Sequence, residues 1–361
     1  MTVYPYLGFG NVTTDDFTAL GNQIRQYETL YNRTTFLRYA PEMQGLWNAY
    51  GQQPTEFISS FQTMYTIVKK LAPNCKIVWA PNTPQGYPYG QGGTEYTTLS
   101  DADRAALDTS GDNALTADDD SLSPYWPGPE YVDWIGISLY YKGPSGGDTS
   151  NTAQTGGYCA QAMNGTNPAT GRNITNWYEN YCATYPDKPC MFAESGAAYH
   201  LNDTTGDSQI DIQTAWINDC ITNRTTFENF PQLKMIMQFE YEKIETSNEG
   251  NDDLRDYRVT NNTAVLSVLK SALSTASSYF EWAASTTQPS IISSAGQAAP
   301  QTNSAGEIIT NAITATTRGR PTTFPSLFGL SSAASQLTEM IELSILVASG
   351  LAGALAVMRY L

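Results

Sequence analysis

Residues 36–47 read FLRYAPEMQGLW, a short β-forming run followed by a glutamate in a loop. Residues 34–39 favour a pleated strand, and Pro41 cannot donate a hydrogen bond to a strand ladder. We therefore expect a strand that stops before Glu42, so that Glu42 lies just past its C-terminal end. A carboxylate among polar and aromatic neighbours there suits a polar, ring-shaped substrate. The alternative is a glutamate of an ordinary surface loop.

Strand-like and helix-like stretches alternate along most of the chain. Strands are predicted at residues 1–10, 36–39, 75–80, 131–140, 189–194 and 233–239. Amphipathic helices are predicted at residues 14–31, 54–71, 175–185, 209–222 and 263–274. Near-continuous apolar strands separated by such helices indicate parallel strands, in a (β/α)8 barrel or a doubly wound sheet. Because several strands end in polar residues and no Gly-rich phosphate loop follows an early strand, we favour the TIM barrel.

The net charge, the aromatic content and the single histidine limit the kinds of substrate and catalytic group to consider. The 361 residues carry a net charge of −16, which argues against nucleic acid as a partner and favours a neutral substrate. The 23 Tyr and 7 Trp suit stacking on sugar rings, although core packing uses such residues too. The single histidine, His200, would have to serve any His-type zinc site or Ser-His-Asp triad. Acid and base chemistry therefore falls to carboxylates, with no catalytic cofactor.

Cysteines and glycosylation sequons point to an oxidising compartment. Five cysteines accompany several Asn-x-Thr sequons, a combination typical of secreted glycoproteins with disulfide bonds. The pairing stays open, because four cysteines permit three arrangements and the fifth is odd. The cysteines are Cys75, Cys159, Cys182, Cys190 and Cys220.

An acidic loop at residues 108–119 has the spacing of a calcium loop of the EF-hand or dockerin type. Asn113 stands at the usual glycine position and tolerates a left-handed backbone. Aspartate instead of glutamate at the last position weakens bidentate closure, and the alternative is a solvated acidic loop. The expected ligands of a structural calcium ion are Asp108, Ser110, Asp112, Ala114, Thr116 and Asp119.

The C-terminal part differs from the rest. We expect a globular domain over residues 1–282 and a Ser/Thr/Ala/Pro-rich stalk over residues 283–332, whose composition cannot bury a core. Residues 333–361 combine small residues, a polar spacer and an apolar tail, which is the order of a glycolipid (GPI) anchor signal. A single transmembrane anchor is the alternative, although the apolar run is short for a span.

Four motifs then carry a family resemblance. The run TFLRYAPEMQGLWNAYGQQPTEF, residues 35–57, resembles the strand-4 region of family 26 glycoside hydrolases, retaining barrel enzymes that include β-mannanases. WAPN at 79–82, YVDWIGISLYY at 131–141 and FAESG at 192–196 are similar to that family's strands 5, 6 and 7, in the same order. The resemblance covers residues 1–260 and implies a (β/α)8 barrel. It aligns residues 1–10 with the third strand, so the first two strands are expected to be missing from this chain.

The resemblance also implies roles for residues. Glu42 matches the acid/base and Glu194 the nucleophile. Pro41 stands where the family usually has histidine, which leaves the mannan assignment open. Glu240, an extra carboxylate near the place where the clan has a tryptophan, is a further candidate for substrate binding. The further positions that match the substrate cleft are Arg38, Trp47, Trp79, Asn82 and Tyr140.

The implied protein is a monomeric retaining glycoside hydrolase that acts on a β-linked polysaccharide, with β-1,4-mannan as the first substrate to consider. The anchor signal would make it a fungal-type GPI-anchored member, bound to the membrane through a lipid at the cell surface or in the cell wall. One alternative is a β-1,3- or mixed-linkage glucanase that remodels the wall. Another is a catalytically inactive carbohydrate-binding wall protein.

Overall fold

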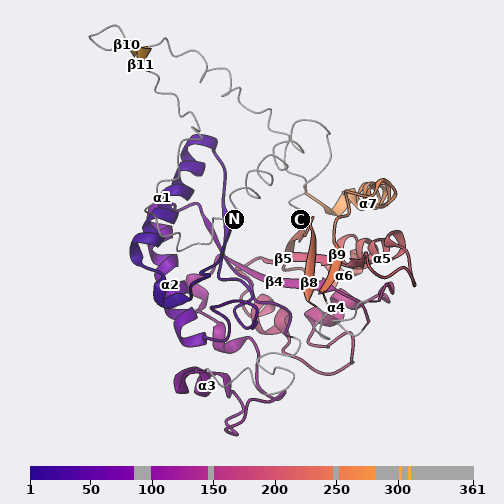
Figure 1. Cartoon of the computed structure of the whole chain (residues 1–361), viewed down its shortest axis with the longest axis horizontal. Coiled ribbons are helices and arrows are strands. Elements are labelled where there is room, and N and C mark those ends of the chain that lie inside the picture. The colour runs from indigo at the N-terminus through magenta and orange to yellow at the C-terminus, as the bar shows by residue number, and fades with distance from the viewer. Residues whose placement is uncertain (85–98, 145–149, 247–251, 282–300, 303–307, 310–361) are drawn as a thin grey trace.

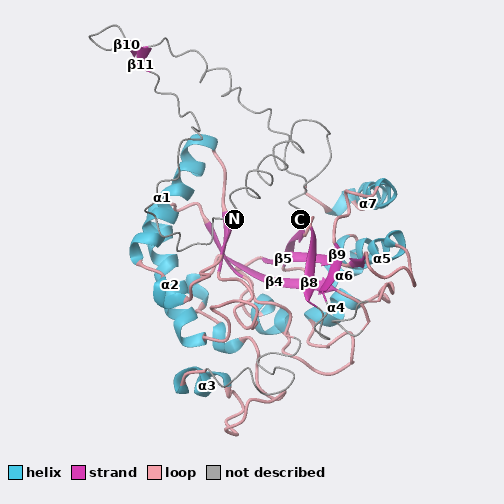
Figure 2. Cartoon of the chain, in the orientation of Figure 1, coloured by secondary structure: helices cyan, strands magenta, loops and turns pink. Residues whose placement is uncertain are grey.

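The computed structural model describes residues 1–84, 99–144, 150–246, 252–281, 301–302 and 308–309 (Figures 1 and 2). The strands are β1 (Thr2–Val3), β2 (Phe36–Tyr39), β3 (Lys76–Trp79), β4 (Trp134–Tyr141), β5 (Cys190–Ala197), β6 (Tyr199–His200), β7 (Leu233–Gln238), β8 (Glu242–Thr246), β9 (Asp252–Asp256), β10 (Gln301–Thr302) and β11 (Ile308–Ile309). The α-helices are α1 (Thr14–Tyr31), α2 (Pro54–Leu71), α3 (Asp101–Leu107), α4 (Tyr158–Met163), α5 (Gln209–Trp216), α6 (Arg224–Asn229) and α7 (Thr263–Thr275). Short 3-10 or π turns are η1 (Phe9–Asn11), η2 (Ser123–Tyr125), η3 (Pro129–Tyr131), η4 (Tyr178–Ala183), η5 (Ile217–Ile221) and η6 (Ser277–Tyr279).

A six-stranded sheet in the order β1-β2-β3-β4-β5-β7 forms the centre of the molecule, and every neighbouring pair is parallel. These are the six strands that the sequence predicts. Helices α1 and α2 begin and end at the predicted residues, and α7 ends one residue later than predicted. Figure 1 shows α1 and α2 side by side on one flank of the sheet.

The two faces of this sheet are covered differently. Alternate strand residues such as Leu37 and Ile77 join one large cluster with the apolar sides of α1, α2 and α5. The opposite face carries a small cluster of residues from the strands and the position just after β3, with no helix residue, namely Val78, Ala80, Met191, Ala193 and Met235. A doubly wound sheet has helices on both faces, whereas a barrel has them outside only. The helix coverage is therefore of the barrel type.

The sheet also curls toward its helix-free face. Neighbouring strands lie about 4.8 Å apart, so a flat sheet would hold β2 and β5 about 14 Å from each other. Arg38 of β2 nevertheless donates to the backbone oxygen of Ala193 in β5 at 2.9 Å. Gly136 of β4 lies inside the curl, where an added Cβ would come within 2.9 Å of the Ala193 Cβ. The result is a curled parallel half-barrel, open between β1 and β7 in the described part of the chain.

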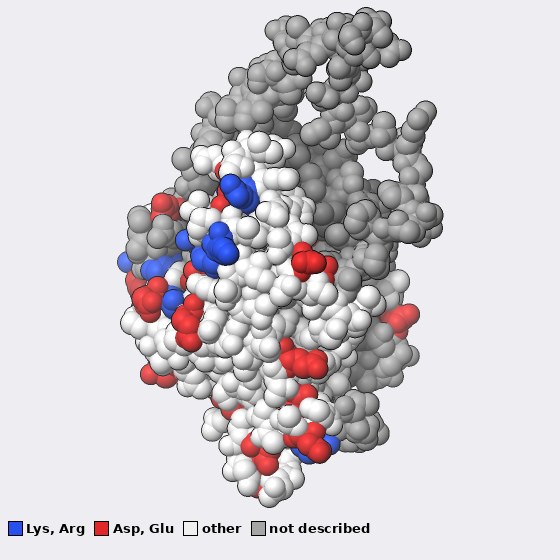
Figure 3. Space-filling view, turned by 90° about the vertical axis from the view of Figure 1, so that its left-hand side faces the viewer, with Lys and Arg blue, Asp and Glu red and all other residues white. Residues whose placement is uncertain are grey.

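The charged groups on one flank are dispersed. Figure 3 shows acidic side chains scattered from the top to the bottom of this face, among uncharged ones. Basic side chains gather mainly in its upper half. The net charge of −16 is therefore not concentrated in one patch on this face.

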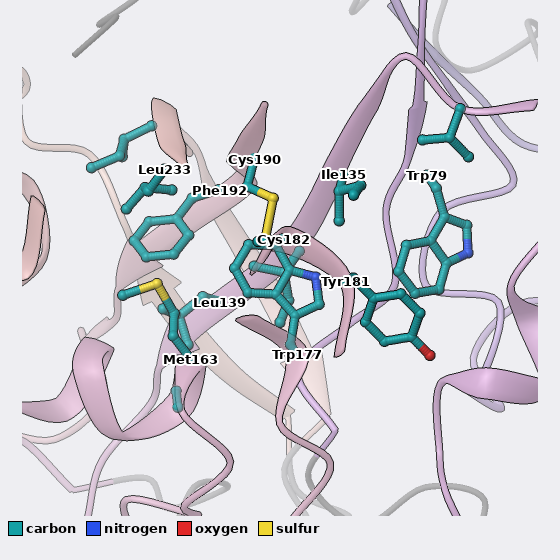
Figure 4. Packing of buried hydrophobic residues seen from close by; sticks show 14 of the residues in the cluster. Trp79, Ile135, Leu139, Met163, Trp177, Tyr181, Cys182, Cys190, Phe192 and Leu233 are labelled. Carbon is teal, nitrogen blue, oxygen red and sulfur yellow. A yellow bond between two sulfur atoms is a disulfide. The ribbon is translucent and has the colours of Figure 1, made fainter. Parts of the chain in front are cut away.

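Aromatic and sulfur-containing side chains fill the space between the sheet and the outer segments (Figure 4). Trp177 and Tyr181, from the segment around η4, point toward β3, β4 and β5 and are buried. A disulfide joins Cys182 of η4 to Cys190 of β5. The segment before β5 is thereby tied to the strand that carries Glu194.

The second disulfide joins Cys159 of α4 to Cys220 of η5, and Cys75 is a buried free thiol. The sequence left this pairing open, so the folded chain decides it. Sulfur and carboxylate atoms of Cys159, Asp219 and Cys220 lie close together, but both sulfurs are engaged in the disulfide.

Several elements differ from the prediction. The strands β6, β9 and β8 form a separate antiparallel sheet that the sequence analysis missed, because β8 and β9 are rich in charged residues and lack an apolar run. The predicted helix at 175–185 is a short π turn, η4, and the predicted helix at 209–222 is divided into α5 and η5. Of the predicted stalk, only the antiparallel pair β10–β11 is described.

Among the described helices, none is long and apolar enough to cross a membrane. The predicted anchor signal at residues 333–361 lies outside the described residues.

Candidate active site

The loop that carries Glu42 has an unusual backbone. Ala40 and Glu42 both have positive φ angles, 45° and 56°, on either side of Pro41. Such conformations cost non-glycine residues about 1–3 kcal/mol each and persist where the surroundings enforce them. Here the Glu42 N–H donates to the Ala80 oxygen at 2.9 Å, and the Tyr50 hydroxyl donates to the Pro41 oxygen at 2.7 Å. The loop after β2 is thus fastened to β3 and to its own far end.

Two donors hold the Glu42 carboxylate. Trp47 Nε1 donates to one oxygen at 3.0 Å, and Asn82 Nδ2 donates to the other at 3.1 Å. Gln44 in turn holds the Asn82 backbone, accepting from its N–H and donating to its oxygen. A side chain at Gly45 would collide with the Trp47 ring, so this glycine makes room for the indole.

Glu194 lies at the C-terminal half of β5, where a register irregularity interrupts the pairing with both neighbouring strands. Arg38 Nη2 forms an ion pair with Glu194 Oε2 at 2.7 Å. The Tyr140 hydroxyl of β4 donates a short hydrogen bond to Glu194 Oε1. Glu194 is therefore held by residues of two other strands, β2 and β4.

Electrostatics separates the two carboxyl groups. Burial raises the pKa of Glu42, and the negative charge of Glu194 raises it further. Burial alone would also raise the pKa of Glu194, but the charge of Arg38 and the hydrogen bonds from Tyr140 and Arg38 lower it below its ordinary value. Glu42 is thus disposed to hold a proton while Glu194 is ionised. Two carboxyl groups whose environments move their pKa values apart are candidates for an acid and base pair.

Aromatic side chains surround the pair. The Tyr140 ring meets Phe239 and Tyr257 edge-on, with centroids 5.7 Å and 5.2 Å away. Tyr4, just after β1, is half-buried, and the charge of Glu194 adds to the effect of burial in raising the pKa of Tyr4. The Trp47 side chain is 53% exposed and can offer a ring face to a ligand.

Most of the predicted cleft residues come together. Arg38, Tyr140 and Glu194 lie on the helix-free face of the sheet, and Asn82 and Trp47 hold Glu42 at the C-terminal ends of the strands. The sequence analysis missed Tyr4 as a neighbour of this pair. The predicted strand at residues 1–10 placed Tyr4 inside a strand, whereas β1 ends at Val3, so no strand-end signal marked this residue.

Two predicted cleft residues lie elsewhere. Trp79 is fully buried on the helix-covered face, where its Nε1 donates to the Tyr125 oxygen at 2.8 Å, so it has no surface for a sugar. An alternating strand puts Trp79 on the face opposite Arg38. The Glu240 carboxylate accepts from the Val259 and Thr260 N–H groups and from the Thr260 hydroxyl. It holds the turn after β9.

The predicted calcium loop keeps part of the expected geometry. Asn113 has a φ of 63°, as a residue at the glycine position of such a loop needs. The Asp108 carboxylate accepts three N–H groups of residues 111–113, and Asp119 accepts those of Ser110 and Thr116. The carboxylates of this loop do not converge on one point among the described residues. They are turned to their own backbone, so the donor set does not fit an ion in this conformation.

A hollow of about 470 Å³ lies at the opposite, N-terminal ends of the strands. Its lining residues are Phe36, Lys76, Asp133, Trp134, Asp187, Lys188, Pro189 and Met235. Glu42 and Glu194 are not among them, so the hollow is separate from the candidate site.

No protein family model matches the chain, and no curated protein sequence matches it. Solved structures resemble it loosely. A GH26 domain of an endo-β-mannanase/endo-β-glucanase from Prevotella bryantii has a TM-score of 0.29, with 16% identity over 56% of this chain and 46% of that one. A GH26-CBM35 β-(1,4)-mannanase from Podospora anserina has a TM-score of 0.28, with 16% identity over 57% of this chain and 30% of that one.

The virulence factor SghA, in complex with the substrate analogue salicin, reaches a TM-score of 0.39 at 12% identity, over 73% of this chain and 68% of that one. The chain matches less than half the length of the two GH26 structures. At these scores the resemblance carries no argument about the reaction. The candidate function therefore depends on the geometry of the site.

Proposed function

We propose that the chain is part of a retaining glycoside hydrolase, built on a portion of a (β/α)8 barrel, with Glu42 as acid/base and Glu194 as nucleophile. The observation that supports it is a pair of carboxyl groups near the C-terminal ends of parallel strands, one held by Trp47 and Asn82 and the other by Arg38 and Tyr140. Glycoside hydrolysis needs one carboxyl group to protonate the leaving oxygen and another to act on the anomeric carbon.

Each role has a physical basis in the surrounding contacts. Arg38 and Tyr140 donate to Glu194, which stabilises its ionised form and leaves it ready to attack the anomeric carbon. Burial raises the pKa of Glu42, which favours the protonated form that can protonate the leaving oxygen. Once the leaving group departs, ionised Glu42 can accept a proton from the incoming water. Asn82 and Trp47 keep its two oxygens oriented through both steps.

We propose β-1,4-mannan as the first substrate to test, with β-1,3- and mixed-linkage glucans next. Exposed Trp47 next to the acid/base supports a pyranose ring as ligand, because indole faces stack on sugar rings. Pro41, where a histidine would offer a hydrogen bond, keeps the choice among these glycans open. A carbohydrate-binding wall protein without activity is the non-enzymatic alternative.

The test distinguishes the roles of Glu42 and Glu194 by comparing substrates whose leaving groups do and do not need a proton. Glu42→Gln should lower kcat/KM on the polysaccharide by about 10²–10⁴-fold, because general acid catalysis contributes that much. It should affect an aryl glycoside far less in the glycosylation step, because a phenolate leaves without a proton. Glu194→Gln should abolish cleavage of both substrates.

The anomer released first, measured by NMR, should keep the configuration of the substrate. An inverted product would exclude the nucleophile role of Glu194. If wild-type protein binds these glycans but cleaves none of them, the binding-protein alternative stands. Full activity of either variant with an intact melting curve would end the assignment of these residues.

We further propose an extracellular location with a C-terminal glycolipid anchor attached near residues 331–334. The support is the order of small residues, polar spacer and short apolar tail in the sequence. A phospholipase specific for inositol lipids should release the protein from cells. A protein that stays membrane-bound after lipase, with the peptide ending in Leu361 seen by mass spectrometry, would identify a transmembrane anchor instead.

A further inference from the structure

A cluster of basic side chains lies beside the candidate site. Lys142 follows β4 directly, and Lys243 belongs to β8. Their ammonium groups lie 3.3 Å and 2.8 Å from the same oxygen of Glu245. Arg255 of β9 pairs with the other Glu245 oxygen at 2.9 Å, and the Tyr257 hydroxyl donates to that oxygen at 2.5 Å. One carboxylate thus faces three cations and a hydroxyl.

The two lysines are placed toward the catalytic carboxylates. Lys142 Nζ lies 5.6 Å from the centroid of the Tyr140 ring, and Lys243 Nζ lies 5.1 Å from that of Phe239. These rings contact each other, and the Tyr140 hydroxyl donates to Glu194. Lys142 therefore contacts the ring of Tyr140, whose hydroxyl bonds to Glu194, and Lys243 contacts the neighbouring ring of Phe239.

The charges in this cluster do not balance. Besides Glu245, the second carboxylate is Asp253, which pairs with Arg255 at 2.7 Å and with buried His200 at 2.5 Å. Among the described residues, Glu245 and Asp253 are thus the two carboxylates that form ion pairs with the three cations Lys142, Lys243 and Arg255.

The other acids of this region in the described part of the chain have partners of their own. Glu242 and Asp256 share Arg258, and the Glu240 carboxylate bonds to residues 259 and 260. Glu194 is matched by Arg38. Lys142 and Lys243, by contrast, share a single oxygen of Glu245 next to the reaction centre.

The lysines also remain accessible. The side chains of Lys142 and Lys243 are 27% and 35% exposed, whereas the Arg255 side chain is 3% exposed. Holding the β8–β9 pair together does not require both lysines, because Arg255 of β9 and Tyr257 just after it already bond to Glu245. The two ammonium groups can therefore reach a ligand at the candidate site.

We propose that Lys142 and Lys243 form a subsite for an anionic sugar, one whose ring carries a carboxylate, next to the bond that is cleaved. This inference rests on the proposed glycosidase function and specifies its substrate class. The carboxylate of a uronic acid unit would receive charge-assisted hydrogen bonds from both ammonium groups. Composition alone predicted a neutral substrate, and the local charges lead to a different conclusion.

The overall charge of −16 limits the kind of acidic glycan. At physiological salt, charges more than about 8 Å away are largely screened, so one carboxylate in the subsite senses the two lysines and their immediate neighbours, and hardly the acidic groups elsewhere on the surface. A long polyanion would meet acidic groups dispersed over the surface, such as those in Figure 3. The expected substrate is therefore a mostly neutral β-glycan with isolated acidic units.

The experiment uses the full chain and oligosaccharides of the β-glycan that it cleaves, lightly oxidised at C6 to carboxylates. The methyl esters of the same oligosaccharides are the uncharged comparison. Wild-type protein should cleave the acid with about tenfold higher kcat/KM than the ester, since a hydrogen bond to a charged group contributes at least that much. Lys243→Met keeps the length of the side chain and its packing on Phe239. It should remove this preference by lowering kcat/KM for the acid, with little change in kcat/KM for the ester. Lys270→Met, on the exposed side of α7, is the matched control and should keep the preference.

Equal kcat/KM for acid and ester in the wild type would overturn the subsite, as would an unchanged preference in Lys243→Met. If the wild type cleaves no glycan, the proposed function fails, and the subsite is then tested by binding of oxidised β-1,4-manno-oligosaccharide. Binding that weakens about tenfold in Lys243→Met and falls with added salt would support it. Binding that is equal in both proteins would exclude it.

Discussion

Replacing Tyr140 with phenylalanine should change the pH dependence of the reaction. The substitution removes only the hydroxyl that donates to Glu194 and keeps the ring packed on Phe239 and Tyr257. Arg38 stays in place as the remaining partner of the carboxylate. The ionised form of Glu194 then loses one of the interactions that lower its pKa, so its pKa rises.

The magnitude follows from the kind of hydrogen bond lost. A hydrogen bond to a charged group contributes about 1.5–3 kcal/mol, and about 1.4 kcal/mol corresponds to a factor of ten. Only ionised Glu194 can attack, so the acidic limb of the kcat/KM profile should move to higher pH. On that limb kcat/KM should fall by about tenfold or more. Above the limb, where Glu194 is ionised in both proteins, the difference should be much smaller.

The assay is a pH profile of kcat/KM on the best glycan, with a melting curve at each pH. Tyr39→Phe is the matched control, because it removes a buried hydroxyl that pairs with Ser60 at 2.7 Å on the helix-covered face. It should leave the acidic limb where it is. An unmoved limb in Tyr140→Phe, or an equal shift in Tyr39→Phe, would refute the assignment of Glu194 as the ionised nucleophile.

Three further expectations concern stability. Gly136→Ala should cost about 1–3 kcal/mol by overpacking the inside of the curl, and a lower melting temperature with unchanged secondary structure would show it. Replacing Cys159 and Cys220 by alanine opens a bridge between residues 61 apart, which should lower stability by about 4 kcal/mol in a denaturant titration. If the loop at 108–119 rearranges to bind calcium, the melting temperature should rise with calcium and fall with chelator; an unchanged curve and no metal by elemental analysis would exclude the site.

The helices and parallel strands could be predicted from local pattern. The apolar positions of α1 and α2 recur at helical spacing, Asp16 completes a capping box with Thr13, and Pro54 suits the first turn of α2. Near-continuous apolar strands likewise indicate parallel pairing. These signals arise from residues close to one another in the chain, so they determined the six strands and the placement of Glu42 after β2.

The arrangement across the sheet depends on contacts between distant residues. Trp79 and Arg38 were both predicted for the cleft. Trp79, however, lies on the helix-covered face of the sheet and Arg38 on the helix-free face. Glu240 also stands at a strand end, yet a turn nineteen and twenty residues later captures its carboxylate. Strand-end position in the sequence is therefore insufficient to define the cleft.

The sequence by itself determined the six parallel strands, the long helices α1, α2 and α7 and the two candidate carboxylates. Only the tertiary structure decided the disulfide pairing, the helix-free face and the different surroundings of Glu42 and Glu194. It also brought Lys142 and Lys243 together on Glu245, about a hundred residues after Lys142 in the chain. Burial and charge–charge interaction depend on distances in space, and the curl of the sheet sets those distances.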